Sequence, residues 1–122
     1  MNLHLRFYLL LALSLLLIAT APGCAVLSDH RVAAGCQVAD GLTTYYALTH
    51  GATEANSLIA GMSPAAILLL KVAFAAAIYF AYKEKKERGE EKSGMDKFAL
   101  GAITVLGCVP AANNLAVIQG LP

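Results

Sequence analysis

Four polar side chains with the chemistry to hold or move an ion stand in an otherwise very apolar chain. Asp40, Thr43 and Thr44 lie close together, and Lys71 interrupts the apolar stretch 63–83. A charge inside a membrane costs about 3 kcal/mol on insertion scales, so such a group is paired or functional by default. The residues therefore predict either a structural ion pair with hydrogen bonds between helices, or a proton or ion site.

Four further polar residues are candidates for the same cluster. Two lie in the turn 51–63 and two near the end of the last apolar stretch. For antiparallel helices that rise 1.5 Å per residue, an Asp40–Lys71 contact is geometrically allowed. The turn residues have a simpler alternative role in turn chemistry. The predicted cluster, in the outer half of a membrane bundle, comprises Asp40, Thr43, Thr44, Glu54, Asn56, Lys71, Asn113 and Asn114.

The residues around Asp40 follow a helical repeat. One seam has members spaced 4, 3, 4 and 3 residues apart, and Gln37 and Thr44 flank it. A polar seam cannot face lipid, so it faces other helices or water. Its members are Cys36, Asp40, Thr43, Ala47 and His50.

Three helices must position these groups, and the predicted fold class is all-α. The clearest membrane span is the second helix, because Ser63 suits an N-cap, Pro64 suits the first helical position and an apolar run follows. The first helix is only moderately apolar. The expected elements are a signal-like N-terminal helix and a three-helix transmembrane or membrane-embedded bundle, with helices at about 31–50, 63–83 and 96–119 and a charged loop at 84–95.

The last helix has a face of small residues. Such a face lets membrane helices approach closely, and Pro110 should kink the helix. The face comprises Thr104, Gly107, Cys108, Ala111 and Ala112. We interpret it as a packing surface, and we interpret Cys36 and Cys108 as small packing residues.

Composition supports a membrane location and one domain. Of the 122 residues, 58% are hydrophobic and none is Trp. Six of the nine Lys and Arg residues fall between positions 83 and 97, and the rest of the chain is nearly free of charge. This distribution argues against a nucleic-acid surface. The length of the chain leaves room for at most three or four spans of about 20 residues.

The N-terminus is typical of a targeting element. An apolar run of 15 residues at 7–21 follows Arg6, and Pro22, Gly23 and Cys24 come next. Residues 1–23 are thus either a cleaved signal peptide or an uncleaved first helix. A third alternative is a lipoprotein acylated at Cys24, because a Cys after a small residue at the end of such a run resembles a lipobox.

The charge pattern and the signal disagree on topology. The positive-inside rule places the segment 83–97 in the cytoplasm, so a spanning helix at 31–50 would start inside. A signal peptide would deliver residue 24 to the outside. The positive-inside placement and the signal-peptide placement agree only if the helix at 31–50 does not cross the bilayer.

The pattern Asp40, Thr43, Thr44, then Gly51, Glu54 and Asn56, resembles a family of small bacterial and archaeal integral membrane proteins classed as a domain of unknown function. The resemblance covers residues 36 to 118 and implies three transmembrane helices, with Glu54 and Asn56 at the outer turn. Ser57 stands where the family usually has Pro. The family implies no activity.

No catalytic pattern is present in the sequence: it has no nucleophile elbow, phosphate loop or pair of helix-borne histidines. We therefore expect no enzyme, no cofactor and no metal, since His50 beside Glu54 is a weak metal signal. Two functions remain, a structural or accessory membrane protein and an ion- or solute-transport component that uses Asp40 and Lys71. Expected partners are membrane lipids and either a homo-oligomer or another membrane protein. The expected location is the bacterial inner membrane, or the envelope if the chain is lipid-anchored.

Overall fold

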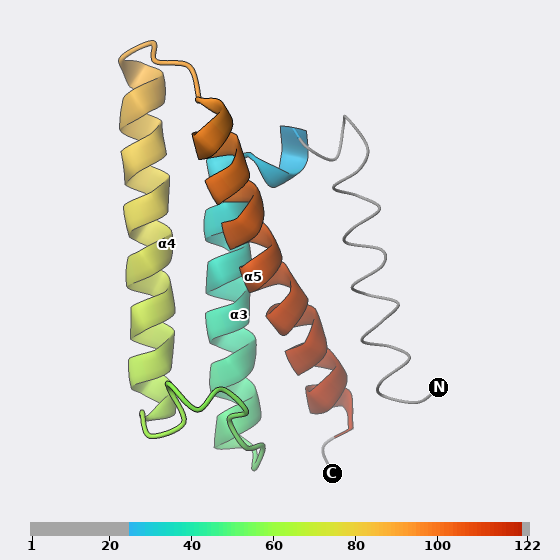
Figure 1. The fold of residues 1–122 in the computed structure, drawn as a ribbon. Coiled ribbons are helices and arrows are strands. Elements are labelled where there is room, and N and C mark those ends of the chain that lie inside the picture. Colours follow the sequence, from blue (N-terminus) through green and yellow to red (C-terminus); the bar gives the residue numbers. More distant parts are fainter. Residues whose placement is uncertain (1–24, 121–122) are drawn as a thin grey trace.

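The computed structural model describes residues 25–120, and these residues are helical, without strands. The all-α prediction is confirmed for this part of the chain. A short helical turn at 25–27 precedes α3 (His30–Thr49), α4 (Pro64–Glu87) and α5 (Gly94–Gln119). Figure 1 shows the helices side by side, each antiparallel to the next, and α3 packs against both α4 and α5. The predicted signal helix and Cys24 lie outside the described residues.

Helix α3 is bounded by local signals at both ends. The Asp29 side chain caps its start by accepting a hydrogen bond from the Arg31 backbone N–H at 2.8 Å. Hydrogen bonds from the Arg31 side chain hold the pKa of Asp29 well below its usual range. Gly51, with φ of +97°, ends the helix, and the Ala52 N–H then bonds to the Ala47 carbonyl. This Schellman motif directs the chain into the turn 51–63.

Helix α4 begins as expected, because Ser63 caps it and Pro64 is its first residue. The predicted end at 83 and the predicted loop 84–95 are wrong, since the helix continues to Glu87. Lys and Glu are good helix formers, and an ion pair of 2.7 Å joins Arg88 to Glu84 one turn earlier. Gly89, with φ of +71°, ends the helix and leaves a loop of only 88–93.

Helix α5 begins at Gly94, two residues before the expected start. Ser93 and Asp96 form a capping box in which each side chain accepts a hydrogen bond from the other's backbone N–H. The helix continues through Pro110 to Gln119. Its buried residues are spaced 4, 3 and 4 apart and face α3: Leu100, Thr104, Gly107 and Ala111.

The apolar core is small and lies toward the charged end of the bundle. One residue from each helix forms it, namely Ala33, Ile78 and Leu100, and Tyr82 and Ile103 pack against it. Most of the large apolar side chains of α4 and α5 are exposed instead. A soluble bundle buries most of its large apolar side chains, whereas α4 and α5 expose most of theirs.

Two helices, α4 and α5, are long and apolar enough to cross a membrane. The helices have 24 and 26 residues, and at a rise of 1.5 Å per residue each is longer than a hydrocarbon core of about 30 Å is thick. Within the most apolar stretch of each, only 17% of the residues are buried. A core helix of a soluble protein would be mostly buried, so the exposed apolar faces suggest a membrane location.

Candidate functional site

The Asp40 carboxylate is the centre of a polar network between the three helices. Asp40 lies in the middle of α3 and is 4% exposed. One of its oxygens, Oδ2, is 2.7 Å from the Lys71 ammonium of α4. This is the contact that helical rise alone allowed. A buried charge is tolerated only when it is paired and hydrogen-bonded, and the ion pair supplies the first of these conditions.

The other Asp40 oxygen, Oδ1, accepts hydrogen bonds from neutral groups on two helices. Thr44 donates its hydroxyl at 3.3 Å, and Asn114 of α5 donates its amide at 3.3 Å. The same Asn114 amide nitrogen also lies 2.8 Å from the Thr44 hydroxyl oxygen and 3.2 Å from that of Thr43. Since an amide nitrogen carries two protons, the three acceptors share them. The carboxylate is therefore satisfied at both oxygens.

Gln37 extends the network by one helical turn. Its Oε1 accepts a hydrogen bond from Lys71 at 3.4 Å, and its Nε2 donates to the Ile103 carbonyl of α5 at 2.9 Å. The sequence identified Gln37 only as a residue flanking the seam. Gln37 lies three residues before Asp40 on the same helix face, and this spacing could have predicted that it belongs to the network.

The buried stripe of α3 differs from the predicted seam. The stripe is wider than the seam and includes three of its five members, Cys36, Asp40 and Ala47. The buried residues of α3 are His30, Ala33, Ala34, Cys36, Gln37, Asp40, Gly41, Thr44 and Ala47. Thr43 lies at its edge, where its hydroxyl donates to the Ala39 carbonyl at 2.8 Å. His50 is exposed and outside the stripe, because α3 ends before it. The seam prediction therefore holds for Cys36, Asp40 and Ala47 and is wrong for Thr43 and His50, and the stripe also takes in Gln37 and Thr44.

Three of the eight predicted cluster residues lie outside the network. Glu54 and Asn56 shape the turn 51–63: Glu54 accepts from the Asn56 N–H at 2.8 Å, and Asn56 accepts from the Leu58 N–H at 3.0 Å. These are local side-chain to backbone bonds, as in the alternative turn interpretation. Asn113, although half-buried, makes no side-chain hydrogen bond within residues 25–120.

Two glycines mark the closest approaches of α3 to its neighbours. A Cβ atom on Gly41 would lie 2.9 Å from the Lys71 Cβ, and a Cβ on Gly107 would lie 2.8 Å from the backbone carbon of Cys36. Both separations are too short for a side chain. The glycines therefore let the helices approach closely enough for Asp40 and Gln37 to reach their partners.

Cys36 and Cys108 are joined by a disulfide between α3 and α5. The interpretation of both as plain packing residues is therefore wrong. They are 72 positions apart in the sequence, and the approach at Gly107 brings their Cα atoms to 4.7 Å. Disulfides persist in oxidising compartments, so the pair also bears on which side of a membrane this part of the bundle matures.

His50 packs against its own helix end. Its ring stacks on Tyr46 with centroids 3.9 Å apart, and its Nδ1 lies 2.8 Å from the Tyr46 carbonyl oxygen. Because a carbonyl only accepts, Nδ1 is the protonated nitrogen. Among residues 25–120, no group of three or more His, Cys, Asp or Glu side chains is arranged to hold a metal ion.

The Lys71 end of the Asp40–Lys71 pair is the more accessible one. The Lys71 side chain is 25% exposed, whereas that of Asp40 is 5% exposed. Lys71 and Gln37 line a cavity of about 380 Å³, together with apolar residues that include Phe74 and Leu106. A small solute or a proton carrier would therefore meet the ammonium before the carboxylate.

Comparison with known proteins gives one match. A family model described as Domain of unknown function (DUF5658) matches residues 32–120, which is most of the chain and includes the whole polar network. No curated protein and no solved structure matches.

Proposed function

Because the chain belongs to the DUF5658 family, a domain of unknown function, we propose its function from its geometry: a structural or accessory membrane protein in which a buried polar network fixes three helices together. Helices α4 and α5 span the membrane, and α3 lies between them with its polar stripe turned inward. The location we propose is the bacterial inner membrane. The proposal assigns the chain no catalytic step.

The observation that carries this proposal is that both Asp40 oxygens have partners within the chain. Lys71 pairs with one oxygen, and Thr44 and Asn114 donate to the other. A site that takes up and releases an ion needs a carboxylate with unused coordination or access to water. This carboxylate is 95% covered and joined to all three helices. Removal of one partner from such a buried pair typically costs about 3–5 kcal/mol, which makes the pair important for folding.

The partly exposed Lys71 side chain favours a second candidate function, an ion- or solute-transport component. Lys71 opens onto the cavity beside Phe74, so Asp40 could exchange a proton or an anion could bind the ammonium there. Charged residues within membrane segments commonly serve such paths. This function requires that the Asp40–Lys71 pair open during a cycle.

Reconstitution of the full chain into liposomes separates the two functions. We would compare the wild type with Asp40→Asn and with Asp40→Asn/Lys71→Met, and use Glu54→Gln as a control that removes a carboxylate outside the network. An internal pH dye reports proton or cation flux, and detergent-resistant folding reports assembly.

If the network is structural, none of the four proteins carries flux above empty liposomes. Asp40→Asn then folds poorly, and the double variant regains most of the loss because no charge stays unpaired. The structural proposal is overturned if the wild type and Glu54→Gln dissipate the gradient while a well-folded Asp40→Asn does not.

A further inference from the structure

We propose that the outer face of α5 binds one anionic phospholipid, with its phosphate at Lys92 and Lys97 and one acyl chain in the groove beside Phe98. The inference rests on the membrane location proposed above. It adds a ligand and a site that are separate from the polar network around Asp40.

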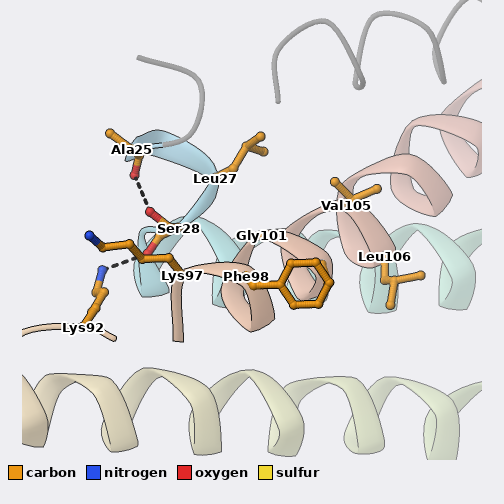
Figure 2. A pocket seen from close by; sticks show the side chains of 10 residues that line it. Ala25, Leu27, Ser28, Lys92, Lys97, Phe98, Gly101, Val105 and Leu106 are labelled. Atoms are coloured by element: carbon orange, nitrogen blue, oxygen red, sulfur yellow. Dashed lines mark hydrogen bonds between the residues drawn. The ribbon is translucent and has the colours of Figure 1, made fainter. Parts of the chain in front are cut away.

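The groove is large and mostly apolar. Its volume is about 890 Å³, within the range of roughly 300–1,000 Å³ typical of small-molecule sites. Figure 2 shows Phe98, Val105 and Leu106 along α5, with Leu27 from the short helical turn that precedes α3. Phe98 is 73% exposed and Leu106 is 66% exposed. These side chains thus lack a covering partner within residues 25–120.

Two lysines stand at one end of this groove. Figure 2 shows Lys92 and Lys97 together beside Ser28, away from Leu106. The Lys92 ammonium donates one hydrogen bond to the Ser28 carbonyl at 2.8 Å and keeps two protons for an anion. Neither lysine forms an ion pair within residues 25–120, and no acidic residue is among the described residues that line the groove. The end of the groove is therefore complementary to a phosphate.

The groove extends along α5 over about the thickness of one lipid leaflet. Lys97 lies in the first turn of α5, and Leu106 is nine residues further, about 14 Å along the helix axis. Half of a hydrocarbon core of about 30 Å is about 15 Å. If α5 spans the bilayer, the lysines lie at the headgroup level and the apolar part of the groove lies among acyl chains. The groove has positive charge at one end and apolar side chains along the rest of its length. This arrangement matches a phospholipid better than a peptide.

The headgroup part of the proposal is tested with the full chain in detergent and native mass spectrometry. The probes are phosphatidylglycerol and phosphatidylcholine of equal chain length. The variant is Lys92→Gln/Lys97→Gln, and Lys83→Gln/Lys86→Gln is a control with the same loss of charge near the same end of the bundle. Neither control lysine lines the groove.

Each lysine near an anionic lipid surface contributes about fivefold in affinity. We expect Lys92→Gln/Lys97→Gln to lower phosphatidylglycerol retention at least tenfold, and the control to change it less than threefold. Equal losses in both variants would overturn the site, because retention would then follow only total charge.

The acyl part is tested by filling the groove. Gly101 lines the groove and a Cβ atom on it meets no atom within 4 Å, so Gly101→Leu adds a side chain at the groove whose Cβ is unhindered. Gly35→Leu is the matched control, since it is also helical, also open and outside the groove. We expect Gly101→Leu to lower phosphatidylglycerol retention severalfold and Gly35→Leu to leave it unchanged. Equal retention by both variants would overturn the acyl site.

A photocrosslinking amino acid at position 98, in native membranes, identifies the occupant directly. A lipid-mass adduct supports the proposal. A crosslinked dimer would show that a second copy occupies the groove, and a crosslink to residues 1–23 would show that the chain's own apolar run does; either result overturns it. Recovery of the chain in the soluble fraction would instead overturn the proposed membrane location, whereas a membrane-bound chain without lipid preference would refute only this inference.

Discussion

Helix α3 is joined to α4 by a charge pair and to α5 by a covalent bond and neutral contacts. Toward α4, the Asp40–Lys71 pair at 2.7 Å lies beside the close approach at Gly41. Toward α5, the disulfide of Cys36, the Gln37 hydrogen bond to Ile103 and the amide of Asn114 lie along one interface. The two interfaces therefore differ in how many independent interactions hold them.

This difference predicts how each interface responds to substitution. The polar contacts of α3 with α4 described above both involve Lys71, which pairs with Asp40 and donates to Gln37, and removal of one partner of the ion pair leaves a buried charge uncompensated. The α5 interface has several weak neutral bonds and one covalent bond, so each single loss is smaller. In the membrane location proposed above there is no hydrophobic drive between helices, which would make both kinds of polar contact important.

The largest expected effect is at the α4 interface. Lys71→Met leaves the Asp40 carboxylate buried without its cation, and we expect a loss of about 3–5 kcal/mol in the free energy of unfolding. Asp40→Asn/Lys71→Met should recover most of this loss, because Asn can still bond to Thr44 and Asn114. The measurement is denaturation by SDS in mixed micelles, followed by circular dichroism. A Lys71→Met protein as stable as wild type would show that the pair does not hold α4.

Loss of the disulfide should be the next largest effect. In Cys36→Ser/Cys108→Ser the crosslink that closes a loop of 72 positions is absent, and we expect about 2–4 kcal/mol of destabilisation. The same denaturation measures it, with wild type in reductant as the matched comparison. Thiol labelling of unreduced, denatured wild type should modify neither Cys36 nor Cys108. Labelling of both would contradict the crosslink between α3 and α5.

A smaller effect is expected at the glycine of the α5 interface. Gly107→Ala places a methyl group 2.8 Å from the Cys36 backbone carbon, which cannot move as a flexible side chain would. Overpacking of this kind costs about 1–3 kcal/mol. Gly101→Ala, on the same helix and in open space, should be neutral or slightly stabilising, since Ala favours helix over Gly. If both substitutions have the same effect, helix propensity alone explains them.

The sequence predicted the centre of the network but not its edges. Asp40, Lys71 and Asn114 could be brought together because charged and amide groups are rare in an apolar chain and helical rise fixes their depth. Glu54 and Asn56 lie elsewhere because the turn 51–63 satisfies them locally, and turn conformation does not follow from periodicity.

The disulfide and the end of α4 depend on tertiary and local details that the patterns did not contain. Cys36 and Cys108 meet because of the packing at Gly107, and the separation of 72 positions carries no signal for their pairing. The end of α4 depends on the positive φ of Gly89, which the charged run 83–97 did not indicate. Periodicity could identify which helices exist but not how each is rotated.

The smallest expected effect tests that rotation directly, at two adjacent asparagines on α5. Neighbouring helical residues point about 100° apart, so only one of the pair can face α3. Asn114 donates to the network and Asn113 does not. We expect Asn114→Ala to cost about 0.6–1.7 kcal/mol, typical of interhelical hydrogen bonds in membranes, because the Asp40–Lys71 pair stays intact. Asn113→Ala should change the free energy of unfolding by less than about 0.5 kcal/mol, as surface substitutions do. A larger loss from Asn113→Ala would mean that α5 is rotated by one residue, and that its neutral bonds to α3 come from a different face.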